Sequence, residues 1–365
     1  MKRLTLSVVL AAAACGSNNN TPTLSPGTRA VIAAPPAMFG PPPGIMSALD
    51  VPSNEVVPNL AAGVVGGDPF LRMAGNMLYV INRDDGDNIT VVDANTITLV
   101  TQIATGTASN PQDVAVVGDK LYVPALGTAG VVVLSQSSGM MTKTIDLNTA
   151  TGETDGQPDC VSAFAVGTDV YVACDLLDET DMNMPPKGNG KIVVIDSTTD
   201  SVRTTITLPV PNPQNEFAQL PDMSLLIAAE DFSDASNGCI VRVTPGANPN
   251  ATCQIKNTDV NGTANHIAVD ASGTAYISVA SLDFTTNSLS SWAMGGSTVT
   301  NSISAASESI TDVAVCPDGS IVAGDAAMAA PGFRVFKGGT ELTKAALPFG
   351  EPPGFGNGMV CYTAQ

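Results

Sequence analysis

Three runs of β-forming residues decide the fold: DVAVVGDKLYV at residues 113–123, GVVVL at 130–134 and MTKTIDL at 141–147. Each run is rich in Val, Ile, Leu or Thr and is bounded by Gly, Asp, Asn or Pro, which is typical of short strands joined by tight turns. The first run holds two strands, because Gly118 and Asp119 interrupt it. The stretch therefore predicts a meander of four strands.

The same unit recurs along the chain. The residues equivalent to Tyr122 lie between 43 and 55 residues apart, and they are Tyr79, Tyr171, Leu226, Tyr276 and Val322. A four-stranded unit repeated every 40–50 residues or so is typical of a β-propeller. We therefore expect a ring of such units, with one blade for each copy.

Two of the copies resemble known families of propeller repeats. LYVIN at 78–82 followed by ITVVD at 89–93 looks like the YVTN type, and IAVD at 267–270 with GTAYI at 273–277 looks like the NHL type. The resemblance covers roughly residues 44 to 365 and implies an all-β propeller. It implies little about function, because such propellers host lyases, lactonases and pure binding modules.

The two ends of the chain supply one further blade. Six complete copies fit between about residues 68 and 347, and the strands left over are 358–363, 29–34, 45–50 and 54–60. Taken in that order they match the first to the fourth strand of a blade. We expect a seven-bladed propeller closed by strands from both termini, which leaves no open sheet edge. Six blades with an N-terminal arm are the alternative.

The cysteines indicate an exported protein with disulfides. The chain has seven, and setting Cys15 aside leaves an even number, which favours three bridges. Two pairs flank hairpins, and the third pair falls on the inner strands of adjacent blades. The expected bridges are Cys160–Cys174, Cys239–Cys253 and Cys316–Cys361.

The N-terminus reads as a lipoprotein export signal. Residues 1–14 combine a basic start with a short apolar run and small residues, and Cys15 follows in a context that resembles the bacterial lipobox. We expect lipid on Cys15, a tether at 15–27 and the propeller at 28–365, with simple secretion as the alternative. The protein would then lie in the cell envelope, at the outer membrane, facing the periplasm or the surface. Its N-terminal lipid would be its only membrane contact.

The charge balance restricts the partners. The chain carries 34 acidic and 15 basic residues, a net charge of −19, so the phosphate backbone of nucleic acid would repel it. Acidic loops at 83–88, 175–183 and 230–234 follow the second strands of three blades and lie on one face. We expect a protein or glycan partner, no nucleic acid, and a monomer.

One residue per blade falls at the start of the inner strand, at one mouth of the central channel. These residues are Phe70, Asp113, Ser162, Glu216, His266, Asp312 and Gly358, with Asn215, Asn265 and Asn357 one position before three of them. Three carboxylates therefore converge with the only histidine of the chain. We predict that Asp113, Glu216, His266 and Asp312 could hold Ca²⁺ or another divalent cation. The mix is similar in kind to that of gluconolactonase-like propellers, and polar residues that only bind water are the alternative.

Two functions remain open after other chemistry is excluded. No GxSxG elbow, phosphate-binding glycine loop or CxxC pair is present. We favour a non-enzymatic binding module, because catalytic residue types are sparse and the repeats are generic. The alternative is a metal-dependent lactonase or lyase in which Glu216 and His266 act as the catalytic residues.

Overall fold

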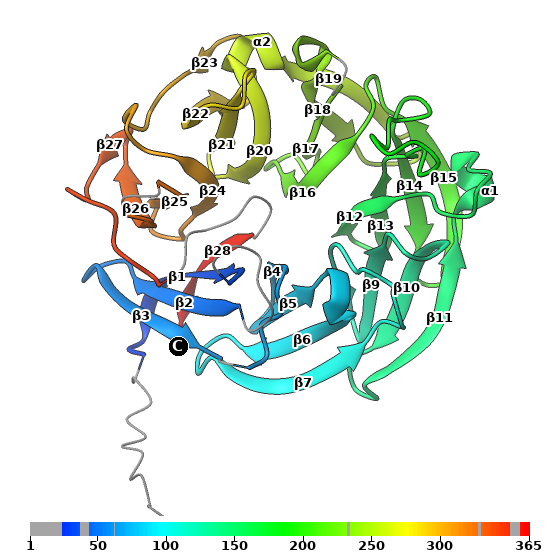
Figure 1. Cartoon of the computed structure of the whole chain (residues 1–365), viewed down its shortest axis with the longest axis horizontal. Helices are drawn as coiled ribbons and strands as arrows, with labels where there is room; N and C mark the ends of the chain where they lie inside the picture. Colours follow the sequence, from blue (N-terminus) through cyan, green and yellow to red (C-terminus); the bar gives the residue numbers. More distant parts are fainter. Residues whose placement is uncertain (1–23, 37–43, 62, 232–233, 328–329, 351–357) are drawn as a thin grey trace, which may run out of the picture.

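Seven four-stranded antiparallel sheets stand around a central axis like the blades of a propeller (Figure 1). The computed structural model describes residues 24–36, 44–61, 63–231, 234–327, 330–350 and 358–365. In six blades the chain runs from the inner to the outer strand through successive antiparallel pairings. The predicted all-β, seven-bladed propeller is confirmed.

The first three blades, each from its inner to its outer strand, are β4 (Pro69–Ala74), β5 (Met77–Asn82), β6 (Asn88–Asp93) and β7 (Thr98–Ala104); β8 (Ala115–Val117), β9 (Lys120–Ala125), β10 (Gly130–Ser135) and β11 (Met140–Asp146); and β12 (Cys160–Val166), β13 (Asp169–Cys174), β14 (Lys191–Asp196) and β15 (Ser201–Thr207). The next three are β16 (Pro213–Gln219), β17 (Leu225–Ala229), β18 (Cys239–Thr244) and β19 (Asn250–Lys256); β20 (Gly262–Val269), β21 (Thr274–Ser281), β22 (Asn287–Ala293) and β23 (Val299–Thr300); and β24 (Ile310–Val315), β25 (Ile321–Asp325), β26 (Gly332–Lys337) and β27 (Thr340–Glu341). The seventh is β28 (Met359–Ala364), β1 (Gly27–Ala34), β2 (Ile45–Asp50) and β3 (Glu55–Leu60).

Within the described residues, helices contribute only single turns in the loops. They are α1 (Asn148–Thr151), α2 (Asn257–Val260) and the 3₁₀ turns η2 (Asp84–Gly86) and η3 (Ala235–Asn237). Among the described residues, no helix has the length and apolar character needed to cross a membrane.

The core lies between the blades, and this explains why the middle strands read as unbroken apolar runs. Each middle strand packs against one neighbouring blade on each of its two faces. In β10, for example, five successive residues are buried. The outer strand β11 of the same blade is mostly exposed and carries polar residues. Of the repeated aromatic positions, Tyr122 and Tyr171 are fully buried and Tyr79 is 2% exposed.

The seventh blade closes the ring with both ends of the chain. β1 pairs with β28 from Gly27 opposite Ala364 to Ile32 opposite Met359, so the first and last strands of the chain lie side by side (Figure 1). Arg29 and Tyr362 both donate hydrogen bonds to the carbonyl of Ala94 in the next blade, over 3.2 and 2.5 Å. The predicted assembly of this blade is therefore confirmed in its strand order as well as its membership.

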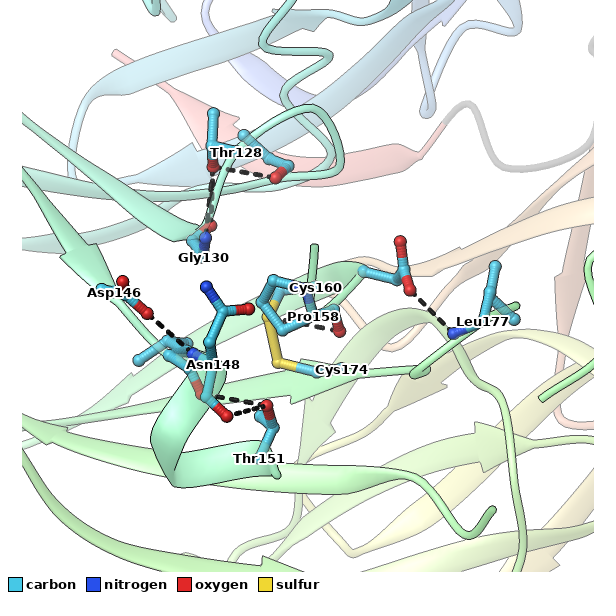
Figure 2. Close-up of a disulfide and its surroundings, with 12 residues drawn as sticks. Thr128, Gly130, Asp146, Asn148, Thr151, Pro158, Cys160, Cys174 and Leu177 are labelled. Carbon is cyan, nitrogen blue, oxygen red and sulfur yellow. Dashed lines mark hydrogen bonds between the residues drawn. A yellow bond between two sulfur atoms is a disulfide. The ribbon is translucent and has the colours of Figure 1, made fainter. Parts of the chain in front are cut away.

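Three disulfides join the cysteine pairs expected from the sequence: Cys160–Cys174, Cys239–Cys253 and Cys316–Cys361. The first links β12 to β13 beside Asn148 and Thr151 of α1 (Figure 2). The third joins the end of β24 to β28 and fastens the closing blade to its neighbour. Disulfides of this number are typical of oxidising, extracytoplasmic compartments. The signal expected at residues 1–14 and the lipid site expected at Cys15 lie outside the described residues.

Candidate functional site

The inner strands bring the four predicted side chains together at the propeller axis and add one more, Arg72. We call Arg72, Asp113, Glu216, His266 and Asp312 the channel cluster. Nδ1 of His266 lies 2.7 Å from Oε2 of Glu216 and 3.7 Å from Oδ1 of Asp312. Nε of Arg72 lies 2.6 Å from Oδ1 of Asp113, and its Nη1 lies 4.0 Å from Oε2 of Glu216. The cluster is therefore a chain of alternating charges contributed by five blades.

Irregular strand pairing aims three of these side chains at the axis. The pairing register shifts between Gln214 and Ala218 around Glu216, between Ala264 and Ile267 around His266, and just before Asp312. Such bulges turn side chains away from the regular alternation of a strand.

The asparagines that precede two of the site residues belong to these bulges. Asn215 has a φ of 54°, a left-handed conformation that Asn tolerates better than most residues. Its Nδ2 donates to the carbonyl of Asn265 over 2.8 Å and joins the bulges of two blades. Asn357, the third of the row, lies outside the described residues.

Asp113 has a full set of partners. Its Oδ1 accepts from Nε of Arg72 and from the backbone N–H of Val114. Its Oδ2 accepts from Nη2 of Arg72, from the hydroxyl of Ser162 and from the N–H of Ala163, all within 3.0 Å. A two-point contact of this kind between a guanidinium and a carboxylate is among the stronger hydrogen-bonded ion pairs in proteins. Asp113 therefore holds Arg72 in place.

Opposite charges decide the protonation of the rest of the cluster. Burial lowers the pKa of His266, but the carboxylates of Asp312 and Glu216 outweigh it and raise that pKa to about 9. Burial raises the pKa of Glu216, but His266 and Arg72 outweigh it and hold that pKa below its ordinary value. Burial raises the pKa of Asp312 to about 6, against the opposing charge of His266. At neutral pH His266 is thus a cation bound to the Glu216 carboxylate.

Most of the cluster is withdrawn from solvent. The sequence placed these residues at one mouth of the channel, and in the structure Asp113, His266 and Asp312 are 0% exposed. Phe70, itself only 2% exposed, lies over His266 with ring centroids 6.3 Å apart. Arg72 in turn lies over the Phe70 ring. Side chains from the inner strands therefore pack against one another at this level.

Below the cluster the channel widens into a cavity of about 550 Å³. All seven inner strands line it, mostly with small or apolar residues such as Ala163, Ala218 and Val313. Of the channel cluster, Arg72 and Glu216 line this space. We call it the channel cavity. Its lining residues fall late in the inner strands, toward the turns that lead to the second strands.

The metal prediction stays a prediction. Within the described ranges, no three His, Cys, Asp or Glu side chains are arranged to hold a metal ion. Oδ2 of Asp312 is buried without a hydrogen-bond partner, whereas Asp113 and Glu216 already contact Arg72 and His266. Binding of Ca²⁺, Mg²⁺ or Zn²⁺ would therefore compete with these two cations.

Arg72 was missed by the sequence analysis, although a signal was present. The alignment took one residue per blade, and Arg72 lies two positions after Phe70. In the part of the chain that the structure describes, it is the only Lys or Arg on an inner strand. A single cation among three carboxylates at the starts of the inner strands would have indicated an ion pair at the axis.

Comparison with known proteins gives the fold and no closer relationship. No protein-family model and no curated protein sequence matches the chain. Its structure is similar to the periplasmic gluconolactonase of Pseudomonas aeruginosa, with a TM-score of 0.60, 13% identity and coverage of 89% of this chain and 97% of that one. It is also similar to AztD of Citrobacter koseri, with a TM-score of 0.56, 14% identity and coverage of 92% and 98%. A third similar structure is the WD40 domain of Neurospora crassa Pan2, with a TM-score of 0.53, 9% identity and coverage of 82% and 79%. All three show the same fold.

Proposed function

We propose that this protein is a lipid-anchored binding module of the cell envelope that takes a small molecule into the channel cavity. The observation that carries the proposal is the cavity itself, whose volume of about 550 Å³ lies within the range of small-molecule sites, about 300–1,000 Å³. Apolar walls around a few convergent polar groups are the usual composition of such sites. Arg72 and Glu216 are those groups here.

The two charged groups indicate the chemistry of the ligand. Arg72 offers a donor at Nη1, because Asp113 occupies its Nε and Nη2. Glu216 stays ionised and offers an acceptor. A group that both accepts and donates, such as a primary amide or a hydroxyl, would satisfy both. The small side chains of the wall, such as Ala163 and Ala218, leave room for a compact body attached to it.

Binding is favoured over catalysis by the position of His266. A general base must reach the proton that it removes, within about 3 Å or through one water. His266 and Asp312 are 0% exposed and neither lines the channel cavity, so only Glu216 of the proposed catalytic pair meets a ligand there. His266 instead holds the Glu216 carboxylate through Nδ1. A carboxylate held in place by a neighbouring cation in this way suits recognition of a ligand.

Three aromatic probes that differ only in their polar end test the proposal. We expect benzamide to bind more tightly than benzoate or benzylamine in titration calorimetry, because it alone matches both groups. Glu216→Gln should weaken benzamide binding by about tenfold or more. Glu55→Gln, on the exposed strand β3, is the matched control and should leave the affinity for benzamide unchanged. Equal weak binding of all three probes, unaffected by Glu216→Gln, would contradict the proposed site.

A hydrolase is the second candidate, because Glu216 is a carboxylate held by a histidine at the floor of a cavity. The similarity in fold to a gluconolactonase makes a lactone the obvious trial substrate. Hydrolysis of glucono-1,5-lactone can be followed in a pH-stat with and without Ca²⁺, Mg²⁺ or Zn²⁺. Turnover that is lost in both Glu216→Gln and His266→Asn would support the enzyme. Turnover equal to the buffer rate would support the binding module.

The lipid anchor is part of the proposal and has its own test. Cys15 should carry diacylglycerol when the full chain is expressed in a bacterium, and the protein should then fractionate with membranes. Cys15→Ser should release it into the soluble fraction of the periplasm or medium. Soluble wild-type protein without lipid by mass spectrometry would support simple secretion instead.

A further inference from the structure

A second, smaller cavity lies on the other side of the channel cluster. It has a volume of about 200 Å³ and shares no lining residue with the channel cavity. Phe70 separates it from His266, and its other walls include Arg83, Asp175 and Asn215. We call it the upper cavity. A space of this size suits a ligand of a few heavy atoms, since typical drug-sized pockets start at about 300 Å³.

Asp175 carries a buried oxygen without a partner. It follows the second strand β13, it is 8% exposed, and its Oδ1 has no hydrogen-bond partner. Asp325 ends the second strand of another blade, and there both oxygens are used, by the N–H groups of Ser309 and Ala327 and by Nε of Arg334. The end of a second strand can therefore supply hydrogen-bond donors from the protein itself to both oxygens of a carboxylate. Asp175 is left unsatisfied and faces a cavity.

Arg83 lines the same cavity and needs a hydrogen-bond acceptor, whereas Asp175 needs a donor. Its Nη2 donates to Asp68 over 2.6 Å, and its guanidinium carbon lies 5.7 Å from the centre of the Phe70 ring. These contacts fix the guanidinium in orientation. Its Nε is nevertheless buried without a hydrogen-bond partner. A buried polar group of this kind is unfavourable until it is paired.

We propose that the upper cavity is a binding site for a small zwitterion of the size of a simple amino acid, with its ammonium group on Asp175 and its carboxylate on Arg83. Each charge of such a ligand would pair with a residue of the cavity wall whose own hydrogen bonds are incomplete, Asp175 or Arg83. A singly charged ligand would pair one and leave the other. The amide side chains of Gln112, Gln214 and Asn215 border the same space and can complete the hydrogen bonds of the ligand. This site is independent of the channel cavity.

Burial and the nearby carboxylate of Asp159 raise the pKa of Asp175 well above its ordinary value. That direction means that the empty site disfavours the negative charge. A ligand ammonium group would supply the missing counter-charge, since an opposite charge a few ångströms away favours the ionised carboxylate. The electrostatics and the geometry therefore indicate the same ligand.

Glycine and two blocked forms of it test the proposal on the purified protein by titration calorimetry. Glycine keeps both charges, N-acetylglycine lacks the ammonium group, and glycinamide lacks the carboxylate. We expect glycine to bind and each blocked form to bind at least tenfold more weakly. No detectable binding of glycine, or equal binding of all three probes, would overturn the proposal.

Two variants assign the binding to these residues. Asp175→Asn and Arg83→Gln should each weaken glycine binding at least tenfold. Asp181→Asn changes an exposed acid of the loop that follows Asp175 and serves as the control with unchanged affinity. Near-ultraviolet circular dichroism establishes that each variant is folded. Should one variant fail to fold, the other together with the three wild-type probes decides the question. Glycine binding unchanged in a folded Asp175→Asn protein would contradict the site.

Discussion

Arg72 and Asp113 form a two-point ion pair across the boundary between two neighbouring blades, with contacts of 2.6 and 2.9 Å. Asp113 is 0% exposed and the Arg72 side chain 20% exposed, so the pair is largely withdrawn from water. Loss of one partner from such a pair leaves the other as an uncompensated buried charge. The pair therefore fixes the geometry of the channel, and its two residues depend on each other.

Replacement of Arg72 tests that dependence. We expect Arg72→Met to lower the free energy of unfolding by about 3–5 kcal/mol, because Asp113 remains charged and buried. The double variant Arg72→Met with Asp113→Asn should recover part of that loss. Arg242→Met is the matched control, because the Arg242–Asp222 pair is more exposed and should contribute about 0–1 kcal/mol. Urea denaturation measures all four values. If Arg72→Met lowered the free energy of unfolding no more than Arg242→Met does, the Arg72–Asp113 pair would not be holding the channel together.

The only histidine of the chain gives a direct measure of the cluster. NMR titration of the His266 ring, on protein without a histidine tag, should show a pKa near 9. The folded pKa exceeds the ordinary value of 6.5, so the stabilisation from His266 is complete below about pH 6.5. It is lost as the pH rises through about 9. The loss should amount to about 3 kcal/mol, with Asp312 ionised throughout this window.

A matched variant separates His266 from other groups that titrate in the same range. His266→Gln should make the fall in stability between pH 6.5 and 9 smaller by the imidazole's share, about 3 kcal/mol. The share that comes from Asp159 and Glu230, whose pKa values burial raises to about 8, should remain. A ring pKa at or below the ordinary 6.5 would mean that Glu216 and Asp312 do not interact with the ring as the structure describes.

Removal of the closing disulfide should cost more than removal of a hairpin disulfide. Cys316 and Cys361 are 45 residues apart, against 14 for Cys160 and Cys174. The chain-entropy model gives a stabilisation of about 4 kcal/mol for the longer loop and about 3 kcal/mol for the shorter one. Replacing each pair by Ala and comparing urea midpoints measures the difference. Equal losses, or a larger loss for the hairpin pair, would argue against a role of the third bridge in ring closure.

The repeat made most of the fold predictable. Strands buried on both faces are apolar along their whole length, so runs such as Val131–Leu134 stand out in the sequence. The turns between them use Gly and Asp at set positions. The seventh blade, built from both ends of the chain, was predictable because six complete repeats leave four strands over, one at the C-terminal end and three at the N-terminal end. Disulfide pairing followed from the same alignment, since Cys316 and Cys361 occupy nearly equivalent places on adjacent blades.

The candidate site was predictable in membership but not in arrangement. Position within the repeat placed Asp113, Glu216, His266 and Asp312 at one level of the channel. The bulges around three of them shift the pairing register, and no periodic pattern reports such a shift. The burial of the cluster also depends on how far the side chains of facing blades reach across the axis. The pairing of Arg72 with Asp113 and the upper cavity follow from that three-dimensional detail.

A crystal structure with benzamide is the sharpest test of whether a small molecule binds in the channel cavity between Arg72 and Glu216. We expect difference density in the channel cavity, with the amide carbonyl at Nη1 of Arg72 and the amide nitrogen at the Glu216 carboxylate. The density should be clearly weaker in Glu216→Gln crystals soaked in the same way. Benzamide bound elsewhere on the propeller, or a channel cavity that holds only ordered water at a saturating concentration, would show that this cavity is not the ligand site.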